Sequence, residues 1–291
     1  IKSTLTAYMK EDVFFNFPDE MEAQINIGDE KSKDLIKTME EHGGYHMLGI
    51  DNYPNGRVMR VVPYNQQGLH DGEFRQYYES GQLAQKGSYK NGLGQGEYIW
   101  YYEEGSIRQK AFYKDDKIEG QVLWYFPSGK IAQTVNYVNG KKEGELIEYY
   151  ENGNLKYEAY LKNNKQDGIV KNYYPNGKLL ARAYFNKKGE INGIEERFYE
   201  NGVIKAKIEW KNGKIEGICE NYYDNGRLES RIPIRNDVIW GTVENYYRNG
   251  KLKSKIYYRC GVEEEILEFY DELGEKKKKL DLDSLLNRKN K

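Results

Sequence analysis

A repeat of 24 residues is the feature of this sequence that most constrains its fold. Each of eight units opens with a glycine, an aromatic pair follows, and a second glycine comes three residues after the pair. A Leu or Ile always stands two residues beyond that second glycine. Such a period predicts stacked supersecondary units, because one short unit cannot bury its own hydrophobic face. The opening glycines are Gly72, Gly96, Gly120, Gly144, Gly168, Gly193, Gly217 and Gly241.

The segment between the aromatic pair and the second glycine predicts a tight bend. Tyr174-Pro175-Asn176-Gly177 places Pro where a type I turn favours it and Gly where φ becomes positive. The glycine then forms a bulge in a three-residue hairpin loop. A second bend, such as Asn91-Gly92, leads to the next unit. We therefore expect an all-β fold: an elongated array of tandem β-hairpins that forms a single curled antiparallel sheet.

The two faces of this sheet follow from simple alternation along the strands. A three-residue loop places Tyr149 opposite Leu155, and alternation then places Ile147 and Ala159 on the same face, the predicted core. The opposite face is expected to carry Trp100, Trp124, the second aromatic of each pair with its hydroxyl in water, and a column of cations. These cations are Lys86, Lys110, Arg182, Lys207, Arg231 and Lys255.

The candidate partner-binding residues are aromatic and basic side chains of that opposite face, since Trp, Tyr and Arg most often anchor interfaces. Other units place polar residues such as Gln76 where Trp100 and Trp124 stand, which favours recruitment of the two indoles for contact. Two alternatives stay open: ring ladders that stiffen the sheet, and burial of both indoles under an N-terminal cap. The candidates are Trp100, Trp124, Tyr102, Tyr150, Tyr174 and Arg182.

The ends of the chain depart from the repeat. Residues 1–47 predict a cap made of a hairpin around residues 13–27 and a short helix over 29–42. Residues 48–273 form the predicted array, with degenerate units at both ends. Residues 274–291 are a basic tail with a short helix over 281–287. The four lysines at 276–279 either touch anionic lipid or are simply solvated.

Composition and motifs argue against several classes of function. The 45 basic and 46 acidic residues give a net charge of −1, so nucleic acid is not an expected partner. No apolar run reaches the ~18 residues of a membrane span. His42, His46 and His70 do not have metal-ligand spacing, and Cys219 and Cys260 are predicted to stay unpaired. We expect no catalytic, cofactor-binding or metal-binding residues and no enzyme; a glycosidase carboxylate pair is the one catalytic alternative left open.

The repeated pattern Gly-x4-[Tyr/Phe]-[Tyr/Phe]-x-[Asn/Ser]-Gly-x-[Leu/Ile] resembles the MORN repeat over residues 50–273. It is most similar to the bacterial variant with a Tyr-Tyr-x-Asn-Gly core, as in the antitoxin-like YwqK family. The resemblance implies an array of hairpins that serves as an interaction surface. Choline- and glucan-binding repeats are also aromatic hairpins, but they have a shorter period and Gly-Trp pairs, and this chain has only four Trp.

The resemblance implies a non-catalytic scaffold that binds another protein, with a toxin as the partner in an antitoxin or immunity version. One alternative is a cell-surface or cell-wall module whose exposed rings stack on glycans. Another is peripheral binding to phospholipid through residues 276–279. The chain begins at Ile1, which indicates a removed signal peptide or a shortened chain. Export to the cell surface or periplasm is favoured over the cytoplasm, but the sequence identifies neither compartment nor partner.

Overall fold

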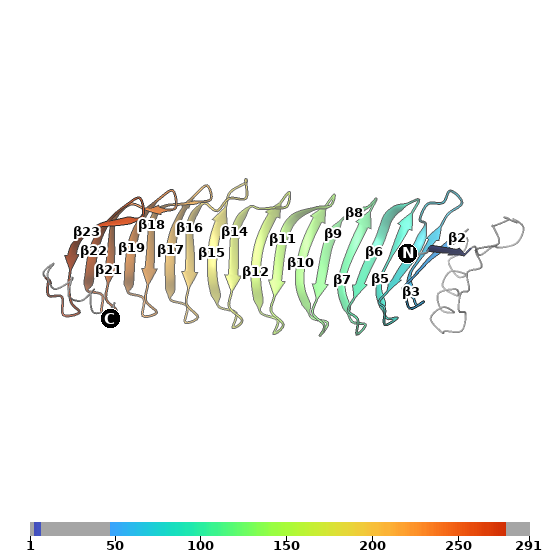
Figure 1. Ribbon diagram of the computed structural model, residues 1–291, viewed down its shortest axis with the longest axis horizontal. Coiled ribbons are helices and arrows are strands. Elements are labelled where there is room, and N and C mark those ends of the chain that lie inside the picture. The colour runs from blue at the N-terminus through green and yellow to red at the C-terminus, as the bar shows by residue number, and fades with distance from the viewer. Residues whose placement is uncertain (1–2, 7–46, 278–291) are drawn as a thin grey trace, which may run out of the picture. The chain divides into compact units, whose positions relative to one another are not determined.

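The computed structural model describes residues 3–6 and 47–277, and within these residues the regular elements are all β-strands (Figure 1). The chain divides into two compact units between Lys142 and Glu143, called here the N-terminal and C-terminal units. The predicted all-β fold of tandem hairpins is confirmed. The predicted hairpin around residues 13–27 and the predicted helices at 29–42 and 281–287 lie outside the described residues.

The N-terminal unit is built of strands that pair with their neighbours in antiparallel fashion. They are β1 (Ser3–Thr6), β2 (Met47–Asn52), β3 (Val58–Tyr64), β4 (Gly72–Tyr77), β5 (Leu83–Lys90), β6 (Leu93–Tyr101), β7 (Ile107–Lys114), β8 (Lys117–Ile118), β9 (Gly120–Tyr125) and β10 (Ile131–Val138).

The C-terminal unit repeats this antiparallel pattern. Its strands are β11 (Lys141–Tyr149, which starts at the boundary), β12 (Leu155–Lys162), β13 (Lys165–Gln166), β14 (Gly168–Tyr173), β15 (Leu179–Phe185), β16 (Gly193–Phe198), β17 (Ile204–Lys211), β18 (Lys214–Tyr222), β19 (Leu228–Arg235), β20 (Val238–Ile239), β21 (Gly241–Tyr246), β22 (Leu252–Arg259) and β23 (Val262–Phe269).

The loops have the geometry that the sequence predicts. Between β11 and β12, the amide of Tyr150 donates to the carbonyl of Asn154, and the amide of Gly153 donates to the carbonyl of Tyr150, both at 2.8 Å. Gly153 has φ +91°, a left-handed conformation that a glycine adopts without strain. At the other end of the hairpins, Asn91 (φ +48°) and Gly92 (φ +83°) form a two-residue turn with the φ signs of type I′.

A second bulge, which the sequence does not reveal, sets the register of every repeat. Tyr149 pairs with Leu155 as predicted, but the next pair is Glu148 with Tyr157, so Lys156 is an extra residue on its strand. Ala159 consequently pairs with Leu146, and the prediction that placed Ile147 on the core face is wrong. The extra residues of the eight repeats are Ala84, Arg108, Ala132, Lys156, Leu180, Lys205, Glu229 and Lys253.

The core is a column of side chains two residues after each opening glycine, and the sheet face that carries it is called the core face. The column consists of Phe74, Tyr98, Val122, Leu146, Val170, Glu195, Cys219 and Val243, all at most 9% exposed. Large side chains in the N-terminal unit face small ones: Phe74 pairs with Gly87, and Tyr98 with Ala111. A Cβ at Gly87 would lie 2.6 Å from the ring of Tyr98, so this position excludes a side chain.

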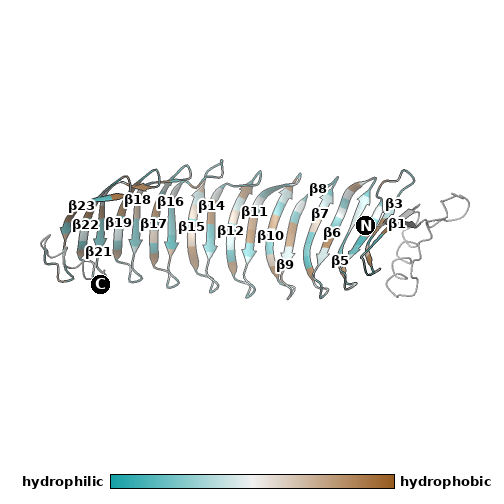
Figure 2. Ribbon diagram, viewed as in Figure 1, coloured by the Kyte–Doolittle hydropathy of each residue, from teal (hydrophilic) through white to brown (hydrophobic). Residues whose placement is uncertain are grey.

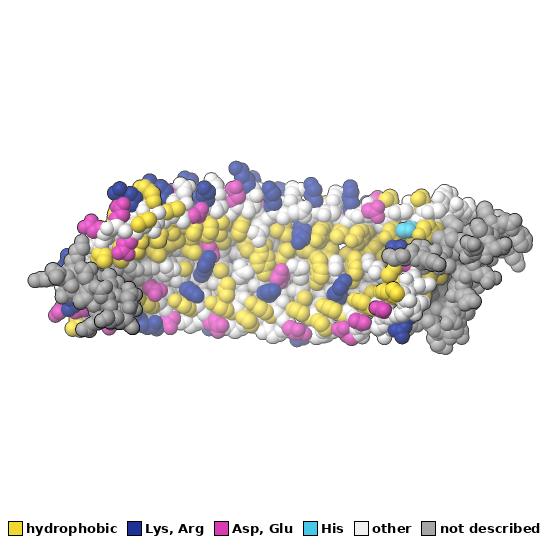
Figure 3. All heavy atoms as spheres, viewed as in Figure 1, with side chains coloured by type: hydrophobic (Ala, Val, Ile, Leu, Met, Phe, Trp, Pro, Cys, Tyr) yellow, Lys and Arg dark blue, Asp and Glu magenta, His cyan; other side chains and the backbone are white. Residues whose placement is uncertain are grey.

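The colouring by hydropathy shows hydrophobic and hydrophilic residues interspersed along single strands, as expected of strands with two different faces (Figure 2). Figure 3 shows hydrophobic side chains gathered in a stripe on the face that displays His70 (cyan). The ring of His70 contacts those of Tyr64 and Tyr89, with ring centroids 4.7 and 5.0 Å apart. Burial, and secondarily the nearby Arg60, lower the pKa of His70.

Candidate functional site

Trp100 and Trp124 lie on the core face, contrary to the prediction that placed them opposite the core. They stand two residues after Tyr98 and Val122, and each pairs with Gln109, on the strand between them. Lys110, the next residue, pairs with Ile99 and therefore projects from the other face. The reason is the second bulge: it shifts the pairing by one residue, and a shift of one residue exchanges the two faces of a strand.

Arg182 lies on that other face, called here the ladder face because charged residues oppose one another across successive strands of the C-terminal unit. Arg182 lies 2.5 Å from Glu196, and Lys171 lies 3.2 Å from Glu158. The signs alternate over most of the ladder, so its charges largely neutralise one another. The ladder runs Glu158, Lys171, Arg182, Glu196, Lys207, Glu220, Arg231, Glu244, Lys255 and Glu268.

The first aromatic of the pair supports this ladder through its hydroxyl. Tyr173 donates a hydrogen bond to Glu158 Oε2 at 2.6 Å. This bond, together with Lys171, lowers the pKa of Glu158. Burial and the same bond raise the pKa of Tyr173 to about 12. The Glu158 carboxylate is therefore held in its ionised form and is already hydrogen-bonded, so it is unlike the raised-pKa acids of general acid catalysis.

The second aromatics Tyr102, Tyr150 and Tyr174 join consecutive repeats. Their hydroxyls donate to the carbonyl oxygens of Tyr125, Tyr173 and Phe198, at 2.8, 2.8 and 2.7 Å. The prediction that the Tyr150 hydroxyl faces water is therefore wrong. The same bond is made by Tyr53, Tyr78, Tyr199, Tyr223 and Tyr247, whereas Phe126 has no hydroxyl to donate. The six candidate residues thus belong to three different environments and do not form one surface.

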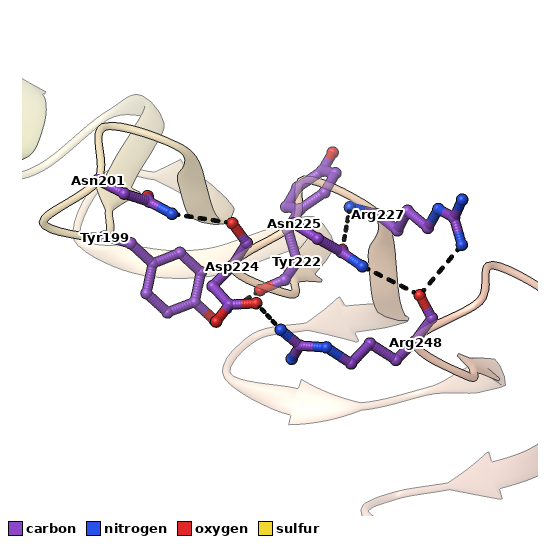
Figure 4. Close-up of polar contacts among 7 residues, drawn as sticks. All are labelled: Tyr199, Asn201, Tyr222, Asp224, Asn225, Arg227 and Arg248. Carbon is purple, nitrogen blue, oxygen red and sulfur yellow. Dashed lines mark hydrogen bonds and ion pairs between the residues drawn. The ribbon is translucent and has the colours of Figure 1, made fainter.

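The hairpin loops of the C-terminal unit add further bonds between repeats (Figure 4). Asn201 donates to the carbonyl of Asp224 at 3.0 Å, and Asn225 donates to the carbonyl of Arg248 at 3.1 Å. The guanidinium of Arg248 forms an ion pair with Asp224 and lies 5.7 Å from the ring centroid of Tyr223. The Asn of the Tyr-x-Asn-Gly core therefore serves stability, because it satisfies the carbonyl of the following loop.

A row of exposed hydrophobic side chains lies on the ladder face, and the predictions from sequence did not include it. Tyr160, Ile169, Tyr184 and Ile194 are 48%, 57%, 46% and 56% exposed. Ile169 pairs directly with Tyr184. Tyr160 stands two residues beyond Glu158, and Ile194 two residues before Glu196, so both extend the same row on β12 and β16. A usable signal existed, since Ile169 and Ile194 follow their opening glycines where Glu73, Glu97 and Glu145 stand in other repeats.

Comparison with known proteins gives the family of the chain. The sequence profile described as "MORN repeat variant" matches eight consecutive segments: 71–91, 95–115, 118–139, 142–163, 166–187, 191–212, 215–236 and 241–259. The chain belongs to the MORN repeat variant family. Each match corresponds to one MORN hairpin and ends at or near the turn that leads to the next, so the structural unit and the sequence unit coincide.

No curated protein matches the sequence of this MORN repeat protein. Among solved structures, "Crystal Structure of TcdB2-TccC3" is 10% identical with a TM-score of 0.20 and covers 92% of this chain and 17% of that one. "Crystal Structure of TcdB2-TccC3-Cdc42" is 9% identical with a TM-score of 0.16, and covers 89% and 15%. The chain thus spans less than a fifth of either of those chains, and similarity at these TM-scores carries no argument about fold or function.

The described part of this MORN repeat protein offers little that could hold a metal or perform thiol chemistry. No three His, Cys, Asp or Glu side chains of the described residues are grouped around a metal position. Cys219 is buried and Cys260 exposed, and both are free, as predicted. Burial raises the pKa of Cys219, which disfavours the reactive thiolate. Over the same residues, no helix has the length and apolar character needed to cross a bilayer.

Proposed function

We propose that this MORN repeat protein is a non-catalytic scaffold that binds another protein through the ladder face of its C-terminal unit. The observation that carries the proposal is the exposed row of Tyr160, Ile169, Tyr184 and Ile194 on four strands, β12, β14, β15 and β16. Contiguous exposed hydrophobic side chains are uncommon on isolated soluble proteins and indicate an interaction site.

The residues around this row are arranged as in a protein–protein interface. The ion pairs Lys171–Glu158 and Arg182–Glu196 run along its side on the same face, which gives a polar border to an apolar centre. Aromatic side chains bury much area at low entropic cost, and Tyr160 and Tyr184 supply two of them. Because the bordering charges are already paired, the partner would be selected by shape and apolar contact more than by net charge.

A role on anionic lipid finds less support. Lys276 lies 3.5 Å from Glu268, and Lys277 lies 2.7 Å from Asp271 and 3.8 Å from Glu275. These carboxylates compete with lipid headgroups for the two ammonium groups. An antitoxin-like role remains one version of the proposal, in which the protein partner is a toxin.

The test is a pair of variants in the full chain. The double variant Ile169→Asn, Ile194→Asn removes the apolar centre, and Val238→Asn, Val262→Asn removes two exposed hydrophobic residues elsewhere in the C-terminal unit. Both variants should melt like the parent, because all four side chains are exposed. A protein that co-purifies stoichiometrically with the parent should be retained by the control pair and lost from Ile169→Asn, Ile194→Asn. Equal retention by both variants would contradict the proposal.

A further inference from the structure

A second surface, independent of the ladder face, lies on the core face of the N-terminal unit. There the strand pairings align one residue from each of six successive strands, from β4 to β10 with β8 outside the row. Gln76 pairs with Gln85, Gln85 with Trp100, Trp100 with Gln109, Gln109 with Trp124, and Trp124 with Gln133. This row, called the Gln/Trp row, alternates amides and indoles after its first member.

The side chains of the Gln/Trp row are available to a ligand. Trp100 and Trp124 are half-buried. The ring of Trp100 contacts that of Tyr98 on the same strand, with centroids 6.0 Å apart and planes tilted by 36°, so Tyr98 helps to hold the indole in place. Within residues 3–6 and 47–277, the side-chain amides of Gln76, Gln85 and Gln109 make no hydrogen bond. Each of these amides can both donate and accept.

The Gln/Trp row carries no charge over its whole length. The corresponding row of the C-terminal unit differs, because it holds the charged residues Glu148 and Arg197. Each forms an ion pair: Glu148 with Lys156 at 3.3 Å, and Arg197 with Glu195 at 2.6 Å. Indole rings that alternate with uncharged amides are the chemistry that recognises a neutral polyhydroxylated ligand. The apolar ring faces stack on the carbon-bound hydrogens of a sugar, and the amides bond to its hydroxyls.

We propose that the Gln/Trp row binds a neutral, extended β-1,4-linked polysaccharide. Trp100 and Trp124 are separated by one strand, so their backbones stand about 9.6 Å apart at ~4.8 Å per strand. This separation is close to the advance of one disaccharide in an extended β-1,4-linked chain, so every second sugar ring meets an indole. The sugars between them meet the amide of Gln109, and those beyond meet Gln85 and Gln133.

A proline-rich peptide is the competing occupant, because a polyproline II helix advances about 9.3 Å per turn and also docks on aromatic side chains. The polysaccharide is favoured because the two indoles do not flank a common slot: Gln109 stands between them. The amide side chains on β5, β7 and β10 can also bond to the hydroxyls of a sugar, whereas a polyproline chain offers only carbonyl acceptors.

The experiment measures binding of cellohexaose, chitohexaose and a decaproline peptide to the full chain by calorimetry and tryptophan fluorescence. At least one hexasaccharide should bind with an affinity that does not change with salt, since the row is uncharged. Trp124→Ala should weaken this binding by about tenfold or more, and Gln109→Met by several-fold, whereas Trp240→Ala in the C-terminal unit should leave it unchanged. Trp124 is chosen because it makes no ring contact with another described residue, so its loss should leave the fold intact.

Failure of both hexasaccharides to bind the full chain would overturn the proposal. So would binding that survives Trp124→Ala, or binding of decaproline alone. Protein capture by the ladder face is a separate measurement, so either proposal can fail without the other.

Discussion

The hydroxyl of Tyr150 donates a hydrogen bond to the main-chain oxygen of Tyr173, 2.8 Å away in the next repeat. Its equivalents link repeat to repeat in each unit. A single 24-residue hairpin is too small to bury a core, so these bonds contribute directly to the contacts between repeats on which an array depends.

Tyr150→Phe should therefore lower the free energy of unfolding by about 1 kcal/mol, since the carbonyl of Tyr173 loses its donor while the ring stays in place. The measurement is urea denaturation followed by circular dichroism. The matched control is Tyr160→Phe, whose side chain is 48% exposed and makes no hydrogen bond to another described residue. A control as destabilised as Tyr150→Phe would show that the bond to Tyr173 contributes nothing.

Gly153→Val should be more damaging than Tyr150→Phe. A Cβ at this glycine would meet nothing within 4 Å, so the cost comes from φ +91° and not from a clash. A β-branched residue held at positive φ is strained by about 1–3 kcal/mol. Gly153→Asn should cost less, because Asn tolerates left-handed backbone better. Equal denaturation midpoints for the Val and Asn variants would contradict the assignment of the cost to backbone conformation.

Alkaline pH should destabilise the C-terminal unit through Tyr222. Burial, then the hydrogen bond to Glu220, raises the pKa of Tyr222 to about 12, against about 10 in an unfolded chain. Because the pKa of Tyr222 is higher in the folded than in the unfolded chain, its contribution to the free energy of unfolding is fully present below about pH 10. That contribution is lost as the pH rises toward 12. Melting temperatures over this range should fall less steeply for Tyr222→Phe than for the parent. Parallel slopes would show that Tyr222 does not contribute to the alkaline loss.

The sequence predicts the hairpin and its turns because each depends on a residue with a distinctive conformational preference. The positive φ of Gly153 and the left-handed turn at Asn91-Gly92 favour specific residue types, so they recur visibly. The second bulge has no such requirement. Its extra residue is Ala84 in one repeat, Arg108 in another and Lys156 in a third. None of these three has a positive φ, so the position does not require a glycine.

The candidate site could not be predicted for the same reason. One undetected residue per hairpin exchanges the faces, which is why Trp100 and Lys110 were expected side by side and lie on opposite faces. The exposed row arises where the sequence varies between repeats. Ile169 and Ile194 stand where three other units have Glu, and a search for shared positions overlooks such variation.

Both proposed surfaces depend on the strand register that the second bulge sets. Cys219 tests it with a native thiol. In the structure Cys219 pairs with Ile232, whereas a hairpin without the bulge would pair it with Arg231. Directly opposed residues have Cα atoms about 4.5–5.5 Å apart, within the span of a disulfide. The measurement is mass spectrometry of peptides from oxidised, unreduced Ile232→Cys and Arg231→Cys variants, each with Cys260→Ser to remove the exposed thiol. A disulfide to Cys219 is expected in Ile232→Cys and none in Arg231→Cys; the reverse result would contradict the register and the assignment of both faces.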